Sequence, residues 1–230
     1  MACCYLVRTR NGIVLIDAGM TTDAGYIFSA CEKTFGIHAK IAAILLTHWH
    51  NDHSAGAADA AFRANIPVFF NELEYPYFSG DTKRGGAISW VADRIPEFGP
   101  FVLFKGLLGN TVPRPVKPTE FVRDGDELLG EFSVIETPGH TNGHTSYFHR
   151  PTGALFAGDA LAVVGKRLRL MSRFVTPDKS RALKSAIKCL DREVSLICPG
   201  HRYPLSDGVD QERARFLKLL NSRNSWPFFG

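Results

Sequence analysis

Three of the eight histidines lie within six residues, in the segment Thr47-His48-Trp49-His50-Asn51-Asp52-His53. Imidazole and carboxylate groups at this density are ligand types that transition metals prefer in proteins. The segment follows an apolar run at 41–46, which has the pattern of a buried strand. The spacing therefore predicts a metal-binding loop at the end of a central strand. The alternative is a polar loop that binds nothing.

Three later segments repeat this arrangement, with a metal-ligand residue just after a predicted strand and beside glycine. They place His140 after Gly139, Asp159 after Gly158 and His201 after Gly200. Glycine permits sharp turns and close backbone approach, and strand ends on a rigid sheet can bring distant ligands together. The resulting five histidines and two aspartates are too many for one tetrahedral ion. They suit two ions that share a bridging carboxylate.

Strand and helix patterns alternate along the chain and must position these residues. A hairpin is predicted from 2–9 and 13–17 around Asn11-Gly12. Further strands are predicted at 41–46, 67–70, 120–122, 127–129, 132–136, 145–149, 154–157 and 194–198. Helices are predicted at 22–34 (capped by Thr21 or Thr22), 55–64, 178–190 and 211–220. Two runs of strands, each followed by helices, predict two sheets packed face to face with helices outside.

The segment 72–118 shows no clear strand or helix pattern. It is rich in aromatic residues, glycine and proline, and its periodicity is poor. We interpret it as an insertion of short helices and loops that caps a pocket. The alternative is that its aromatic residues fill a second small core. With 230 residues, the chain is expected to form one domain over 1–230.

The composition is that of an ordinary globular protein, with 45% hydrophobic and 22% charged residues. The net charge of +4 does not by itself indicate nucleic acid. We see neither a membrane-spanning run nor a signal peptide, and expect a cytoplasmic protein. The five cysteines lack zinc-knuckle spacing and are interpreted as reduced thiols. The expected partner is a small-molecule substrate, without membrane or nucleic acid, and a homodimer is left open.

The segment 48–53 matches the HxHxDH signature of the metallo-β-lactamase-fold hydrolases, and His140, Asp159 and His201 match the remaining ligand motifs in order. The resemblance runs from Asp17-Ala18-Gly19 to His201. It implies an α/β fold, a four-layer αβ/βα sandwich of two mixed β-sheets flanked by helices. It assigns one ion to His48, His50 and His140 and the other to Asp52, His53 and His201, with Asp159 as the bridge.

The resemblance also implies a chemistry. Two divalent ions, with zinc as the first expectation and iron or manganese as alternatives, share a water and give a metal-bound hydroxide at neutral pH. Asp52 orients this hydroxide and accepts its proton, and is the expected catalytic residue. The reaction class is therefore metal-assisted hydrolysis.

The motifs around His140 and Asp159 resemble the thioesterase and lactonase branches, which include hydroxyacylglutathione hydrolase. Only 29 residues follow His201, so the helical glutathione-binding domain of that enzyme is not expected. We predict cleavage of a small ester, thioester or lactone. The alternatives are a phosphodiesterase or nuclease, a β-lactam hydrolase, a persulfide dioxygenase with one iron, and a non-catalytic protein that keeps the fold. Asp159 argues against a β-lactamase, because β-lactamases of this fold generally have cysteine or serine near there.

Several other polar residues have two interpretations each. His144 either hydrogen-bonds a ligand carboxylate or simply begins a strand. Lys166, in the basic cluster 166–169, either holds an anionic substrate group or belongs to a solvated turn. Tyr203 either donates a hydrogen bond to an oxyanion or packs on the sheet. His38 and His149 are expected to be ordinary surface residues.

Overall fold

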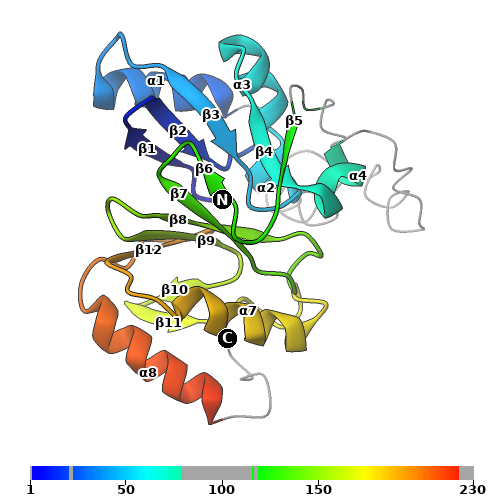
Figure 1. Ribbon diagram of the computed structural model, residues 1–230, viewed down its shortest axis with the longest axis vertical. Coiled ribbons are helices and arrows are strands. Elements are labelled where there is room, and N and C mark those ends of the chain that lie inside the picture. The colour runs from blue at the N-terminus through cyan, green and yellow to red at the C-terminus, as the bar shows by residue number, and fades with distance from the viewer. Residues whose placement is uncertain (1, 21–22, 79–115, 117–118, 223–230) are drawn as a thin grey trace, which may run out of the picture. The chain divides into compact units, whose positions relative to one another are not determined.

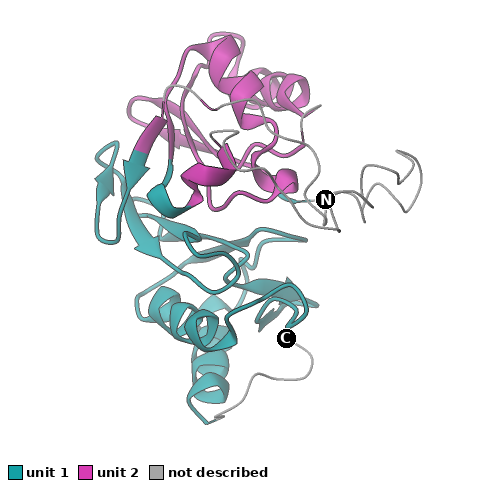
Figure 2. Ribbon diagram, turned by 90° about the vertical axis from the view of Figure 1, so that its right-hand side faces the viewer, with its two compact units in different colours: residues 1–3, 70–73, 121–230 teal, residues 4–69, 74–120 magenta. Residues whose placement is uncertain are grey.

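The computed structural model describes residues 2–20, 23–78, 116 and 119–222. The chain divides into two compact units, coloured separately in Figure 2. We call them the N-terminal unit (Cys4–Phe69 and Glu74–Glu120) and the C-terminal unit (Met1–Cys3, Phe70–Leu73 and Phe121–Gly230). The expectation of a single domain stays a prediction. Most of the predicted insertion at 72–118 lies outside the described residues.

The first sheet is mixed and contains β1 (Tyr5–Thr9), β2 (Gly12–Ile16), β3 (Ile41–Leu45), β4 (Val68–Asn71) and β5 (Thr119–Val122), in that order (Figure 1). β1 and β2 form the predicted antiparallel hairpin, in which Thr9 pairs with Gly12. β3 runs parallel to both β2 and β4. Strands of parallel sheets are covered on both faces, which explains why every residue of β3 except Ala42 is buried.

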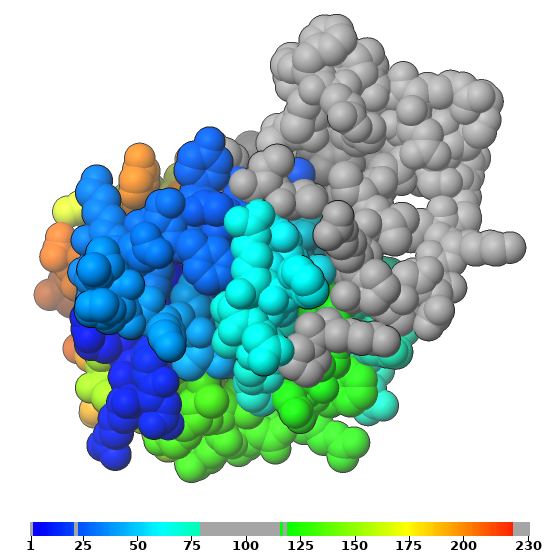
Figure 3. All heavy atoms as spheres, turned by 90° about the horizontal axis from the view of Figure 1, so that it is seen from above, coloured from blue at the N-terminus to red at the C-terminus, as the bar shows by residue number. Residues whose placement is uncertain are grey.

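The N-terminal unit carries α1 (Ala24–Phe35), α2 (Asn51–Ser54), α3 (Ala57–Ala64) and α4 (Tyr75–Phe78). A 3₁₀ helix, η1 (Glu72–Glu74), directly precedes α4. α1 and α3 lie at the surface and are blue and cyan in Figure 3. The rings of Tyr26 on α1 and Phe62 on α3 are exposed. Asp23 is the N-cap residue of α1, and the predicted caps Thr21 and Thr22 lie outside the described residues.

The predicted helix at 55–64 agrees with α3 within two residues, but the short helix α2 before it was not predicted. The chain becomes helical at Asn51, one residue after His50, and the helix is interrupted before α3 begins at Ala57. The interruption is at Gly56, where a Cβ would overlap the carbonyl oxygen of Ala18. The metal-binding segment is thus half loop and half helix, and Asp52 and His53 lie on α2.

The second sheet is also mixed, with the order β12-β9-β8-β7-β6. Its strands are β6 (Glu127–Leu128), β7 (Phe132–Glu136), β8 (Thr145–His149), β9 (Ala154–Gly158) and β12 (Leu196–Pro199). β6 to β9 are antiparallel neighbours, and β12 runs parallel to β9. The helices α7 (Lys179–Leu190) and α8 (Val209–Asn221) agree with the predicted ones within two residues.

A small hairpin of β10 (Ala162–Val164) and β11 (Arg167–Arg169) was not predicted. Its tip is Gly165-Lys166, where both φ angles are positive, at 57° and 63°. This conformation belongs to tight two-residue hairpin turns, which favour glycine at such positions. Part of the predicted basic turn at 166–169 is therefore a strand.

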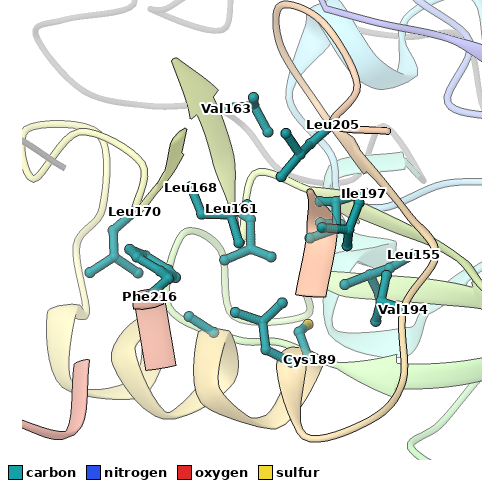
Figure 4. Close-up of a cluster of buried hydrophobic side chains, with 14 of the residues drawn as sticks. Leu155, Leu161, Val163, Leu168, Leu170, Cys189, Val194, Ile197, Leu205 and Phe216 are labelled. Atoms are coloured by element: carbon teal, nitrogen blue, oxygen red, sulfur yellow. The ribbon is translucent and has the colours of Figure 1, made fainter. Parts of the chain in front are cut away.

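The core of the C-terminal unit lies between the second sheet, the small hairpin and the two helices. Figure 4 shows Leu155 of β9 and Ile197 of β12 packed with Leu168 of β11, Cys189 of α7 and Phe216 of α8. Two mixed sheets flanked by helices confirm the predicted α/β class. Among the described helices, none has the length and apolarity required to cross a membrane.

Candidate metal centre

Three histidines of the N-terminal unit, His48, His50 and His53, lie together just after β3. His48 and His53 are both fully buried, and their ring centroids are 4.3 Å apart. His48 Nε2 lies 3.0 Å from Nδ1 of the half-buried His50. Asp52 is next to this group, with its Oδ2 3.9 Å from His53 Nε2. All four predicted ligands of this unit are therefore in one cluster.

The buried carboxylate of Asp17 supports this cluster through hydrogen bonds with Thr47 and His53. It accepts hydrogen bonds from the backbone N–H of Thr47 at 2.8 Å and from the Thr47 hydroxyl at 2.9 Å. Its Oδ2 lies 2.7 Å from His53 Nδ1. A carboxylate can only accept here, so Nδ1 of His53 donates and Nε2 is left as the ligand atom. Ligand motifs alone missed this role, although the Asp17-Ala18-Gly19 turn was part of the resemblance.

The residues that begin the predicted insertion support the same loop. Glu74 is 1% exposed, and its Oε2 accepts a hydrogen bond from the backbone N–H of Trp49 at 2.9 Å. The indole of Trp49 stacks on the Tyr77 ring with centroids 4.4 Å apart, and it meets the His50 ring edge-to-face at 4.5 Å. No local pattern indicates the contacts with Glu74 and Tyr77, because these partners are over twenty residues from Trp49.

Asn51 was not singled out in the sequence, although it lies between two proposed ligands. Its side chain is 1% exposed, and among the described residues neither its amide nitrogen nor its amide oxygen has a hydrogen-bond partner. An unpaired buried amide costs free energy, so it is normally kept only where a water or ligand pairs with it.

The C-terminal unit carries a second cluster at three strand ends. Asp159 follows β9, His201 follows β12 and His140 lies in the loop after β7. Asp159 Oδ2 is 3.3 Å from His140 Nε2 and 3.4 Å from His201 Nε2. The side chains of His140 and Asp159 are both buried, whereas that of His201 is 28% exposed. The predicted placement of these three ligands at strand ends is thus observed.

Close backbone contacts shape the turns that carry these side chains. The N–H of Gly200 donates to the carbonyl of Gly158 at 2.7 Å, which joins the ends of β12 and β9. Gly139 has a φ of +139°, and a Cβ there would overlap the backbone nitrogen of Ala182 in α7. Glycine is required at position 139 both by the backbone conformation and by the lack of space.

The structure places the remaining predicted residues as follows. His144 is buried beside Asp159, whose backbone N–H donates to His144 Nε2 at 2.9 Å. Lys166 is exposed and lies 3.4 Å from the Asp207 carboxylate, while Tyr203 is 84% exposed. Their roles in substrate binding stay predictions.

The two other histidines differ from each other. His38 is exposed, as predicted. The prediction for His149 is wrong, because it is 1% exposed and hydrogen-bonds Glu131 at 3.1 Å and Thr152 at 2.8 Å. These hydrogen bonds offset the cost of burying the imidazole. The pairing of β7 with β8 brings Glu131 close to His149, and local sequence does not reveal this contact.

The cysteines are thiols, as predicted, and none of the five is in a disulfide in the part of the chain that the structure describes. Burial raises the pKa of Cys189 to about 11 and that of Cys198 to about 12. These two thiols are therefore protonated at neutral pH and are poor nucleophiles.

Residues 2–201 match the model of the metallo-beta-lactamase superfamily. The chain belongs to this superfamily. The predicted resemblance is confirmed, and the chain is a member of a family of metal-dependent hydrolases.

Individual members of the superfamily are similar over most of the chain. A probable metallo-hydrolase of Bacillus subtilis, YflN, is 30% identical over 217 residues, covering 85% of this chain and 77% of that protein. The hydroxyacylglutathione hydrolase of Pectobacterium atrosepticum is 29% identical over 224 residues. That match covers 96% of this chain but 65% of the enzyme, so this chain spans about two thirds of its length.

Solved structures confirm the metallo-β-lactamase fold. TTHA1623 in a di-iron-bound form has a TM-score of 0.68 at 25% identity, covering 94% of this chain and 96% of that one. The BLEG-1 B3 metallo-beta-lactamase has a TM-score of 0.67 at 21% identity, covering 94% of each chain. At this identity the second comparison supports the fold alone.

Proposed function

We propose that this protein is a binuclear metal-dependent hydrolase that cleaves a small ester, thioester or lactone. The donor set carries the proposal, since each unit holds a cluster of imidazole and carboxylate side chains at its strand ends. All seven are of types that can hold a metal ion: His48, His50, Asp52, His53, His140, Asp159 and His201. In this proposal the two clusters form one centre, divided between the ions as the resemblance implies, with Asp159 as the bridging ligand.

Two divalent ions held by these seven side chains would supply a hydroxide at neutral pH and would polarise the carbonyl oxygen of the substrate. The protein's own residues hold and orient these parts. Asp52, whose side chain is 33% exposed, orients the nucleophile and accepts its proton at the carboxylate. Asp17 keeps Nε2 of His53 available by accepting a hydrogen bond from its Nδ1–H group. Zinc is the first metal to test, and iron is the second because TTHA1623 was solved in a di-iron form.

The hydroxyacylglutathione hydrolases among the relatives support a thioester or related acyl substrate. Glutathione thioesters are candidates, but the chain spans about two thirds of those enzymes. A phosphodiester substrate has less support, because Lys166 and Arg167 of the basic cluster both pair with carboxylates, of Asp207 and Glu212.

The test combines metal analysis with a hydrolysis panel. We expect about two ions per chain in zinc- or iron-loaded protein, and turnover of at least one acyl thioester, lactone or aryl ester that a chelator abolishes. Asp52→Ala is expected to lower turnover by orders of magnitude while the fold is retained. Asp59→Ala is the matched control, because Asp59 lies on α3 and pairs with the exposed Arg63 of the same helix.

Three outcomes would overturn the proposal. They are turnover of phosphodiesters only, oxygen consumption with a glutathione persulfide, and hydrolysis that a chelator leaves unchanged. A near wild-type rate for Asp52→Ala would remove Asp52 from the reaction.

A further inference from the structure

His144 lies between two proposed ligands of the C-terminal unit, and it is completely buried. The backbone N–H of Asp159 donates to His144 Nε2 at 2.9 Å. The His144 ring stands perpendicular to the His140 ring, with centroids 6.1 Å apart. One imidazole therefore contacts the backbone of the proposed bridging ligand and also lies near the ring of a second ligand.

The hydrogen bond from the Asp159 backbone sets the tautomer of the His144 ring. A backbone N–H can only donate, so Nε2 must accept and carries no hydrogen. The proton of the neutral ring is then on Nδ1, which lies 2.7 Å from the Thr137 hydroxyl oxygen. The Ser146 hydroxyl donates to the carbonyl of Ala157 at 3.1 Å. The Thr137 hydroxyl lies 3.0 Å from the Ser146 hydroxyl and 3.5 Å from the His144 carbonyl, so Ser146 is the nearer acceptor for its proton.

This chain of hydrogen bonds begins and ends on the same segment. It leaves Asp159 through the backbone N–H, passes through His144, Thr137 and Ser146, and returns to Ala157, two residues before Asp159. Thr137 follows β7, Ser146 is in β8 and Ala157 is in β9, so three neighbouring strands are tied together at the turn that carries Asp159. Thr137, Ser146 and His144 are each at most 1% exposed, which keeps water from competing for these bonds.

We propose that His144 is a positioning residue, fixed as the Nδ1–H tautomer by the Asp159 backbone N–H on one side and by Thr137 and Ser146 on the other, and that it sets the backbone position of Asp159. The inference rests on the proposed function, in which Asp159 and His140 hold metal. Partners that orient ligands in this way typically contribute 10- to 100-fold to metal affinity. The tautomer is the specific claim, because a His144 that only filled space would need neither a particular tautomer nor the Thr137 hydroxyl.

The decisive variants are Thr137→Val and Thr137→Ser. Valine has nearly the shape of threonine but removes the acceptor for the His144 Nδ1 proton, whereas serine keeps the hydroxyl. Thr176→Val is the matched control, since Thr176 is also 1% exposed and its hydroxyl donates to the Ser172 carbonyl instead. All three substitutions lie in the C-terminal unit.

The first readout is the ring ¹⁵N spectrum of metal-free, histidine-labelled full-length protein, with His144 assigned from a His144→Gln sample. We expect a protonated Nδ1 and an unprotonated Nε2 in wild type, Thr137→Ser and Thr176→Val. In Thr137→Val we expect a changed Nδ1 signal, because the Nδ1 proton has lost its acceptor. The second readout is Zn²⁺ affinity by chelator competition. It should fall about 10- to 100-fold in Thr137→Val and stay within a few-fold of wild type in the other two.

An Nε2-protonated His144 in wild type would overturn the inference, and so would wild-type Zn²⁺ affinity in Thr137→Val. Equal losses in Thr137→Ser and Thr137→Val would also contradict it. Neither readout uses substrate. If both readouts agree with the inference while no ester, thioester or lactone is cleaved, then the proposed reaction fails and the positioning role stands.

Discussion

Asp17 shows how one buried carboxylate fixes a metal-binding segment. Its backbone has a φ of 56°, a left-handed conformation that is uncommon outside glycine, asparagine and aspartate. In this position the side chain meets Thr47, just after β3, and His53, on α2. The loop and the helix turn that hold the proposed ligands are therefore joined through a single residue from another strand end.

We expect Asp17→Asn to weaken metal binding about 10- to 100-fold and to lower the free energy of unfolding by about 1–3 kcal/mol. Asparagine tolerates the left-handed backbone, but its amide NH₂ would face a donor on Thr47 or His53. Chelator competition and urea unfolding measure the two effects. Asp59→Asn, in an exposed ion pair with Arg63, should change both by little. Unchanged metal affinity in Asp17→Asn would show that His53 does not need this carboxylate.

Among the elements, close packing of a turn on a helix sets the position of His140. Gly139 lies against the first turns of α7, and its carbonyl accepts from the N–H of Asp178, the N-cap residue of that helix. The Asp178 side chain in turn accepts from the N–H of Arg181. The start of α7 and the His140 turn thus form one packed unit.

Gly139→Ala is expected to lower the free energy of unfolding by about 2–5 kcal/mol, because the new Cβ adds a steric overlap with α7 to a strained φ. Gly125→Ala is the control, since Gly125 has a φ of +84° but a Cβ added there would meet nothing within 4 Å. Gly125→Ala should lower the free energy of unfolding by only about 1–2 kcal/mol, because only the backbone conformation is strained. Urea denaturation measures both, and equal losses would show that contact with α7 contributes nothing.

A second element contact, between β11 and α8, depends on pH. Burial alone would raise the pKa of Glu212, but hydrogen bonds from Arg215, the Leu168 N–H and Arg167 outweigh it and lower the pKa to about 2. Because the folded pKa is depressed below the ordinary value of 4.5, the stabilisation is present above pH 4.5. It is lost as the pH falls towards 2.

We expect the difference in unfolding free energy between wild type and Glu212→Gln to be at most about 3 kcal/mol near neutral pH. It should shrink between about pH 4.5 and pH 2 as the carboxylate of wild type is protonated. Denaturant titrations across this range measure it. Glu193→Gln, at an exposed position of the same unit, is the control. A difference that does not change with pH would mean that the charge of Glu212 is not what links α8 to β11.

For the molecule as a whole, the proposed function requires that ligands from both compact units share the ions. Binding of metal to the folded protein alone stabilises it by mass action, by about 2.7 kcal/mol at one hundred times the dissociation constant. If ligands from both units share the ions, this stabilisation must reach both units. A centre held by the N-terminal cluster alone would stabilise only that unit.

Amide hydrogen exchange with and without Zn²⁺ tests this. We expect increased protection after metal binding at 46–54 in the N-terminal unit and at both 137–144 and 158–160 in the C-terminal unit. The exposed end of α8 serves as an internal control and should not change. Protection confined to 46–54 would contradict a shared centre.

Sequence patterns alone were enough to predict the family, the α/β class, most strands and helices, and the positions of the ligand-type residues. These features are local, because apolar periodicity and a glycine beside a histidine or aspartate can be read within a few residues. Only the folded chain reveals that Asp17 holds His53, that Glu74 holds the Trp49 backbone, that His149 is buried against Glu131, and that α2 begins at Asn51. Each of these depends on groups brought together by strand pairing or by packing on a neighbouring turn, and hydrogen bonds between distant residues leave no periodic pattern in the chain.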